Sequence, residues 1–471
     1  MVALALVMTP VAPAAQVRVV TSSPFSTERA AMRGAVGLMV PGKGPTVSRE
    51  ETLEALGHLP SCRRCELFIW VSLPPPGEHH NVTRYPVAIF GRGYHGLLVS
   101  DRTRIPGLIS VFDIAPTVRA LERGKKPPVT SRADADAPRT LHHLDRTLTR
   151  AHDARDPAML LMISLLVAYG LAGLFLRSRL LARAAVLVPP VALASSLVLS
   201  GAGAQRPGLV VTVLGIVTGI GSLAGAALLR DPRALAAAFV ALLLAYLVVM
   251  WAWPVTNSLA VIGPHPDGGG RYYGVTNEMS TLLLAPAFLA ASLLGRAFFV
   301  PVAVLALVTV GASFSGADGG GAVTLLAGFL VLGVRVSGMK LTWRRLALVG
   351  AATVALALAF VGLDAALGGS SHVTRAFEGG PGTIAGDIGH RLHISWDGAT
   401  SPWYHVLLML IAFAGLAWAG TRKPRSAVVD ALLVAIVVSL LVNDTPVDVA
   451  GFGALSAMTV ASWRRTEPRL E

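Results

Sequence analysis

Apolar residues occur along this chain in two patterns, as long blocks after residue 156 and as short runs before it. A helix of about 20 apolar residues is long enough to cross a bilayer core of roughly 30 Å. The long blocks are centred near Val167, Ala192, Thr218, Leu243, Phe288, Leu305, Leu326, Ala355, Ile411, Val437 and Ala457. We therefore predict a mainly α, polytopic α-helical membrane bundle of about 11 spans over residues 157–471.

The first part of the chain has the pattern of a small α/β domain. Short apolar runs punctuated by glycine and proline predict strands at Val17–Val20, Ala35–Val40, Leu67–Val71, Val87–Phe90, Leu97–Val99 and Leu108–Phe112. Arg49–Leu56 and Ala115–Leu121 lie between strands and have a helical pattern. We predict an α/β domain at residues 16–123. Residues 1–15 are interpreted as the remnant of a signal peptide or first membrane helix, the alternative being a buried strand.

Residues 124–156 are rich in Pro, Asp, Arg and His, which predicts a polar linker with an exposed amphipathic helix. His142, His143 and His152 lie in this segment. Carboxylates at helical spacing do not accompany them, so we predict no metal site there.

Composition narrows the class of protein. Hydrophobic residues make up 53% of the chain and charged residues 14%, with a mean hydropathy of +0.62, values that exclude an ordinary soluble enzyme. The formal net charge of +13 raises the question of nucleic-acid binding. Most cations of the apolar part, however, lie in short connections at block ends, where they determine topology, so no nucleic-acid partner is predicted.

The connections between blocks alternate in charge. One set carries Arg177, Arg179, Arg183, Arg230, Arg233, Arg296, Arg335, Lys340, Arg344, Arg345, Arg422, Lys423, Arg425, Arg464, Arg465 and Arg469, and the other set carries Arg206, Arg271, Arg375 and Arg391. The cation-rich side of a membrane protein is cytoplasmic. We therefore predict a multi-pass protein of the plasma (inner) membrane, with its N-terminal domain extracytoplasmic and its C-terminus cytoplasmic.

Both cysteines of the chain, Cys62 and Cys65, lie in one short segment. A local disulfide is the favoured interpretation for a domain outside the cytoplasm. A redox pair and two plain thiols are the alternatives.

Polar residues of chemical interest gather on the predicted outer side. The segment Gly270–Glu278 holds a cation, two phenols, an amide and a carboxylate between two apolar blocks. Ionisable groups at span ends are costly unless they are paired or solvated, so they indicate a functional site. The candidate catalytic residues are Glu278, Asp318, His372 and His390, and the candidate substrate-binding residues are Arg271, Tyr273, Asn277, Arg375, Arg391, Asn443, Asp444 and Asp448. For single residues the alternatives are helix capping, close helix packing and interfacial anchoring.

The segment Tyr85–Leu121 resembles the C-terminal part of alkaline-phosphatase-superfamily domains of the sulfatase and phosphodiesterase type. In these, a strand ending in a glycine turn is similarly followed by a stretch like Asp113-Ile-Ala-Pro-Thr117 at the start of a helix. Catalysis in that superfamily uses a Ser or Thr nucleophile beside metal-binding Asp and His residues. The sequence shows no such N-terminal motif, and Ser100-Asp101-Arg102 has arginine where a histidine ligand is expected. The resemblance thus implies a truncated, metal-free relative.

The whole arrangement also resembles a bacterial family of polytopic proteins in which a degenerate phosphatase-like ectodomain precedes about ten spans. The matching features are Gly34–Met39, Arg271–Glu278 and Ser371–Arg375. This resemblance implies no activity.

We interpret the chain as an integral membrane protein of the bacterial cell envelope that handles a lipid-linked phosphate or glycan substrate. In this hypothesis the arginines bind diphosphate, and His372, His390 or Glu278 is the general base. The alternatives are a transporter or lipid flippase, with Pro189-Pro190 and Gly215–Gly225 as possible helix breaks, and a non-catalytic envelope assembly protein. No cofactor is predicted. The expected partners are the lipid bilayer and envelope proteins.

Overall fold

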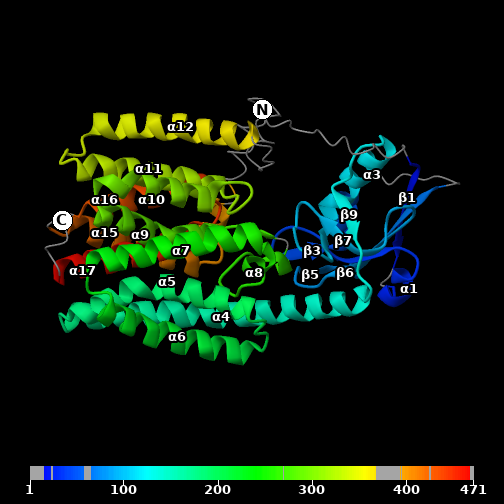
Figure 1. The fold of residues 1–471 in the computed structure, drawn as a ribbon, viewed down its shortest axis with the longest axis horizontal. Coiled ribbons are helices and arrows are strands. Elements are labelled where there is room, and N and C mark those ends of the chain that lie inside the picture. The colour runs from blue at the N-terminus through cyan, green and yellow to red at the C-terminus, as the bar shows by residue number, and fades with distance from the viewer. Residues whose placement is uncertain are drawn as a thin grey trace, which may run out of the picture. The chain divides into compact units, whose positions relative to one another are not determined.

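The structure is a computed structural model that describes residues 15–22, 25–57, 65–268, 270–366, 393, 395–423 and 426–466. It consists of two compact units (Figure 1). Unit 1 comprises Met1–Asp153 and Pro264–Tyr273, and unit 2 comprises Ala154–Gly263 and Gly274–Glu471.

Unit 1 is built on a seven-stranded mixed sheet with the order β1-β4-β6-β2-β7-β9, in which β8 also pairs with β2. Strand β1 is parallel to β4, and β6 is antiparallel to both β4 and β2. All six residues of β2 are buried, as its continuous apolar run requires at the centre of a sheet. The strands are β1 (Val17–Ser22), β2 (Ala35–Val40), β4 (Leu67–Ser72), β6 (Tyr85–Phe90), β7 (Gly96–Ser100), β8 (Leu108–Ser110) and β9 (Val129–Arg132).

Short helices and a small second sheet complete the α/β part of unit 1. Strands β3 (Thr46–Ser48) and β5 (Glu78–His80) form an antiparallel pair. Ser48 and Glu51 form a capping box that starts α2. The helices are α1 (Thr27–Ala31), α2 (Arg49–Leu56), η1 (Val111–Asp113) and α3 (Ile114–Glu122). The predicted α/β region is confirmed, with a strand at each of the six predicted runs.

Residues 124–156, which the composition predicts to be a polar linker, contain regular structure. Strand β9 pairs antiparallel with β7 at the edge of the sheet. Helix α4 (Ala137–Phe175) then continues through Pro157 into the apolar sequence. Cys65 is disulfide-bonded. The only other cysteine in the sequence, Cys62, lies outside the described residues. The predicted pairing of Cys62 with Cys65 therefore stays a prediction.

Unit 2 is a helical bundle in which each of the eleven predicted block centres lies on a helix. Besides the later part of α4, the described helices are α5 (Arg179–Gly201), α6 (Pro207–Leu228), α7 (Pro232–Ala252), α8 (Pro254–Ser258), α9 (Asn277–Leu294), α10 (Arg296–Gly311), α11 (Gly319–Val336), α12 (Trp343–Ala366), α15 (Tyr404–Thr421), α16 (Ala427–Val442) and α17 (Pro446–Thr466).

Eight helices within the described residues are long and apolar enough to cross a membrane. They are α4, α5, α6, α7, α9, α11, α12 and α15. Helices α10 and α16 have 16 residues each, about 24 Å at 1.5 Å per residue. The structure therefore fits a multi-pass membrane protein, while the predicted number of eleven spans is not confirmed.

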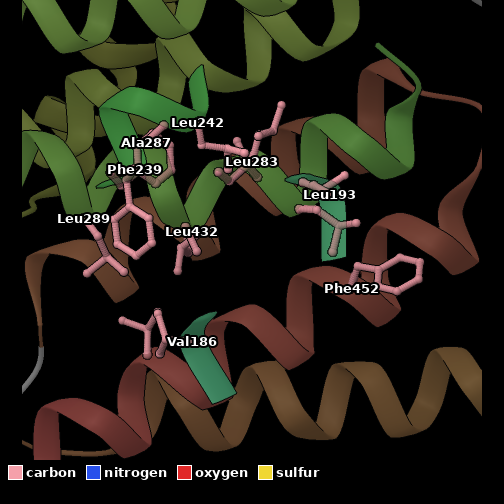
Figure 2. Close-up of a cluster of buried hydrophobic side chains, with 14 of the residues drawn as sticks. Val186, Leu193, Phe239, Leu242, Leu283, Ala287, Leu289, Leu432 and Phe452 are labelled. Carbon is pink, nitrogen blue, oxygen red and sulfur yellow. The ribbon is translucent and has the colours of Figure 1, made fainter. Parts of the chain in front are cut away.

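Helix α9 is the centre of the bundle and packs against α5, α7, α10, α11, α16 and α17. Figure 2 shows Leu283, Ala287 and Leu289 of α9 among buried side chains of its neighbours. Gly328 of α11 allows the closest approach, because a Cβ there would lie 2.1 Å from the ring of Phe288. The start of α9 is thus held within the bundle by packing along its length.

Polar contacts join the helix ends that the charge pattern assigns to the same side. At the end predicted to face outward these pairs are Ser200 with Thr256, Asn277 with Asp444, and Ser313 with Asp364. At the opposite end Arg335 pairs with Asp430 at 2.7 Å, and Arg183 donates to the carbonyl of Leu229. The alternation derived from the sequence therefore agrees with the contacts of the bundle.

Candidate functional site

The entry to α9 is fixed by close backbone packing. Gly274 has φ 84°, and a Cβ there would lie 2.0 Å from the carbonyl oxygen of Gly316, so a side chain is excluded. The Val275 N–H donates to that carbonyl at 2.8 Å, and Asn257 Nδ2 donates to the Gly274 carbonyl at 2.7 Å. Thr276 then caps the helix by accepting from the Met279 N–H. The first turn of α9 is therefore held in one orientation.

Asn277 links the start of α9 to the start of α17. Its Nδ2 donates to Asp444 Oδ1 at 2.8 Å and to Thr445 Oγ1 at 3.2 Å. Two of the sequence-predicted binding residues, Asn277 and Asp444, thus lie together although 167 positions separate them.

Glu278, the next residue, lies in a group of charged side chains from several helices. Asp448 of α17 and Arg155 and Asp156 of α4 are within electrostatic reach of its carboxylate. Asp448 in turn interacts with His405 of α15. We name Arg155, Glu278, His405 and Asp448 the charged cluster. Four helices thus each contribute one of its members.

The charged cluster combines the groups needed for proton transfer and anion binding. Arg155 is only 8% exposed, and a guanidinium can hold a phosphate or carboxylate through two parallel hydrogen bonds. The His405 Nδ1 lies 2.7 Å from the carbonyl oxygen of Gly398 and therefore carries a proton, which leaves Nε2 as the nitrogen that can accept one. Together with two carboxylates, these groups are suited to general acid–base chemistry on an anionic substrate.

Asp318 and Asn443 lie beside the glycines at the start of α11. Asp318 is 2% exposed at the N-cap position, and a Cβ on Gly321 would lie 2.4 Å from its Oδ2. A Cβ on Gly320 would lie 2.0 Å from Asn443 Oδ1. The Asn443 Nδ2 donates to Ser439 Oγ at 2.7 Å. Close approach of Asn443, at the end of α16, therefore accounts for the absence of a side chain at Gly320.

Arg271 and Tyr273 belong to unit 1, whereas Gly274–Glu278 belong to unit 2. The Tyr273 ring lies under the guanidinium of Arg104, 3.8 Å from its centroid. The polar segment that the sequence presents as one group is thus divided between the two units at residue 273.

Four predicted residues, His372, Arg375, His390 and Arg391, lie outside the described residues. Their roles stay predictions. Within the described residues, no group of three or more His, Cys, Asp or Glu side chains is arranged to hold a metal ion.

Sequence reasoning missed two members of the charged cluster, Arg155 and His405. Arg155 lies in the predicted linker and precedes the first apolar block, so it was counted with the linker charges. His405 directly follows Trp403 and Tyr404 at the beginning of a block. The position of both at the end of a span was the available signal, because ionisable groups there indicate function.

No protein-family model, curated protein or solved structure matches this chain. The candidate site therefore rests on its own geometry.

Proposed function

We propose that this chain is an envelope membrane enzyme of a bacterium that acts on a lipid-linked phosphate or glycan at the outer face of the plasma membrane. The observation that carries the proposal is the charged cluster, in which a nearly buried arginine, a histidine and two carboxylates come from four helices. The helices fit a multi-pass membrane protein. The N-terminal domain would then be extracytoplasmic and the C-terminus cytoplasmic, an orientation that rests on the cation asymmetry.

In the proposed reaction an acceptor hydroxyl attacks the anomeric carbon of a sugar carried on a lipid diphosphate. Glu278 accepts the hydroxyl proton, a new glycosidic bond forms, and the lipid diphosphate leaves with the electrons of the broken bond. Arg155 stabilises the charge of the leaving diphosphate. His405 and Asp448 complete the acid–base group by exchanging the proton with water.

The test uses the full-length protein in lipid nanodiscs with a radiolabelled polyprenyl diphosphate-linked sugar, water serving as the acceptor. We expect saturable binding and slow sugar release. Arg155→Lys keeps the charge but loses the paired hydrogen bonds, and should weaken binding by about tenfold. Glu278→Gln should leave binding intact and slow release by about 100-fold or more.

Asp397→Asn is the matched control, because Asp397 is an exposed carboxylate paired with His393 and not with the charged cluster. This variant should bind and turn over like the wild-type protein. Absence of saturable binding, or equal turnover by the Glu278→Gln and wild-type proteins, would contradict the proposal.

The transporter or flippase alternative loses two of its supports. Helix α5 continues through Pro189 and Pro190, and α6 continues through Gly215–Gly225, so neither predicted helix break is present. Transport of the labelled lipid across a vesicle membrane without chemical change would nevertheless favour this alternative. If neither release nor transport is seen, the non-catalytic assembly protein becomes the better hypothesis.

A further inference from the structure

Residues 264–273, which join α8 to the start of α9 in sequence, belong to unit 1. We name this segment the latch loop. Three contacts tie it to other parts of unit 1. His152 Nδ1 lies 2.7 Å from Asp267 Oδ2, Asn81 Nδ2 donates to the Gly268 carbonyl at 3.2 Å, and Arg104 lies over the Tyr273 ring. The loop is therefore held by α4, by the segment after β5 and by the segment after β7.

The fourth contact joins Tyr272 to Ser110, the residue that caps the short helix η1 together with Asp113. The Tyr272 hydroxyl interacts with Ser110, and Asp113 and Arg102 lie within electrostatic reach. Burial raises the pKa of Tyr272 to about 12, with Asp113 acting in the same direction. The ring is 8% exposed. The latch loop thus covers the Asp113 end of the sheet.

Both carboxylate oxygens of Asp113 accept hydrogen bonds from other residues of unit 1. Ser100 Oγ donates to one oxygen at 2.7 Å, the Ser110 N–H donates to the same oxygen at 2.9 Å, and Arg102 Nε donates to the other at 2.7 Å. These donors satisfy the Asp113 carboxylate, and Tyr272 interacts with one of them, Ser110. This end of the domain is therefore arranged to hold a loop of its own chain.

We propose that the α/β domain acts as a docking platform for the latch loop, and that Tyr272, Tyr273 and Arg104 are positioning residues for this loop. The chain passes from Tyr273, held in unit 1, to Gly274, packed in unit 2 against Gly316. The inference assigns the domain a role that does not depend on the proposed substrate.

Arg104 is a suitable position for a test, because glycine fits its backbone conformation but lacks its side-chain contact. Its φ of 55° lies in the left-handed region that glycine adopts without strain. Arg104→Gly therefore relieves the backbone while it removes the guanidinium over Tyr273. Tyr272→Phe removes one hydroxyl and keeps the ring. Neither change removes a residue from the charged cluster.

The experiment is hydrogen exchange of the full-length protein in nanodiscs, read on peptides that cover residues 264–276. In Arg104→Gly and in Tyr272→Phe we expect these amides to exchange about tenfold faster, while peptides from β2 and β6 keep wild-type protection. Tyr94→Phe is the matched control. Its hydroxyl donates to the Val129 carbonyl within the same unit, so loop exchange should not change.

Wild-type exchange of the loop in both variants would overturn the proposal. Faster exchange of the loop together with the whole sheet in Tyr272→Phe would also overturn it, since that result would mark Tyr272 as a general stabiliser of the domain. Loop-specific release with unchanged sugar release would uphold the platform and separate it from the proposed enzymatic function.

Discussion

Two carboxylates, Asp113 in unit 1 and Glu278 in unit 2, differ in what surrounds them. Asp113 accepts hydrogen bonds from Ser100, Arg102 and the Ser110 N–H. Glu278 interacts electrostatically with Arg155 but also with the like charges of Asp448 and Asp156. A buried carboxylate with its hydrogen bonds filled stabilises a fold, whereas like charges held close together oppose it. We therefore expect the fold to need Asp113, and Glu278 to be kept for a reason other than stability.

Replacement of Asp113 should have the largest effect. Asp113→Asn leaves the Arg102 guanidinium without its buried counter-charge, and we expect unit 1 to lose about 3–5 kcal/mol of unfolding free energy. Proteolysis of the full-length protein under native conditions, read on fragments of residues 65–132, measures this loss. Asp101→Asn changes the exposed carboxylate next to Arg102 in the sequence, and should alter stability by less than about 0.5 kcal/mol. If the two variants were cleaved at the same rate, Asp113 would not be a residue that stabilises unit 1.

Alkaline pH should weaken unit 1 through Tyr272, the side chain that covers this same cluster. Its pKa is about 12 in the fold, raised by burial from 10.0. The folded protein holds the proton of Tyr272 more tightly than the unfolded protein does. The contribution of Tyr272 to the free energy of unfolding is therefore fully present below pH 10 and is lost as pH rises from about 10 to about 12. Two pKa units correspond to about 3 kcal/mol. The measurement is unfolding of unit 1 against pH, with tyrosinate absorbance as the titration signal.

In the Tyr272→Phe protein, the free energy of unfolding of unit 1 should fall less steeply between about pH 10 and about pH 12. Tyr94, whose pKa burial also raises to about 12, should still titrate in the variant. The stability of the Tyr94→Phe protein should therefore also fall less steeply with pH, and the stability of the double variant should fall least. A Tyr272→Phe curve that coincides with wild type would show that the phenol does not reach the Asp113 cluster.

At the start of α11, Gly320 tests whether Asn443 is a packed group like Asp113. A methyl group on Gly320 would lie 2.0 Å from Asn443 Oδ1, so Gly320→Ala should destabilise the bundle by about 1–3 kcal/mol. Gly451→Ala on α17 meets no atom within 4 Å, and should be neutral or stabilising by up to about 1 kcal/mol. Thermal unfolding in detergent compares the two. Similar melting temperatures would mean that Asn443 moves aside without cost.

The sequence predicted the elements well where one pattern dominates. Continuous apolar runs such as Ala35–Val40 became buried strands, and each predicted block centre lies on a helix. It missed β9, because Val129–Arg132 is half polar and gains its stability from pairing with β7. Tertiary context decides such edge strands, and local composition does not show it. The sequence predicted a helix in the linker but not that this helix continues into the first apolar block as α4.

The candidate site was predictable in part for a related physical reason. Glu278 and Asp448 stand out as ionisable residues at span ends, and Asn277 and Asp444 likewise. Which of these groups meet depends on helix packing over more than 160 positions, so the contact between Asn277 and Asp444 was not visible. Asp318 lies at the N-cap position of α11 close to Gly321, and its candidate catalytic role stays a prediction.

Glu278→Gln should have the smallest effect on stability. It therefore tests whether the fold needs Glu278 as it needs Asp113. The amide keeps the shape of the side chain and removes the repulsion by Asp448, so the free energy of unfolding should stay within about 1 kcal/mol of wild type or increase. Thermal unfolding in detergent, followed by the fraction that remains monodisperse, measures it. A loss of several kcal/mol would place Glu278 with Asp113 among groups that the fold needs. Unchanged or greater stability leaves the carboxylate without a structural reason, because a charge that opposes folding at the end of a packed helix persists only where chemistry requires it.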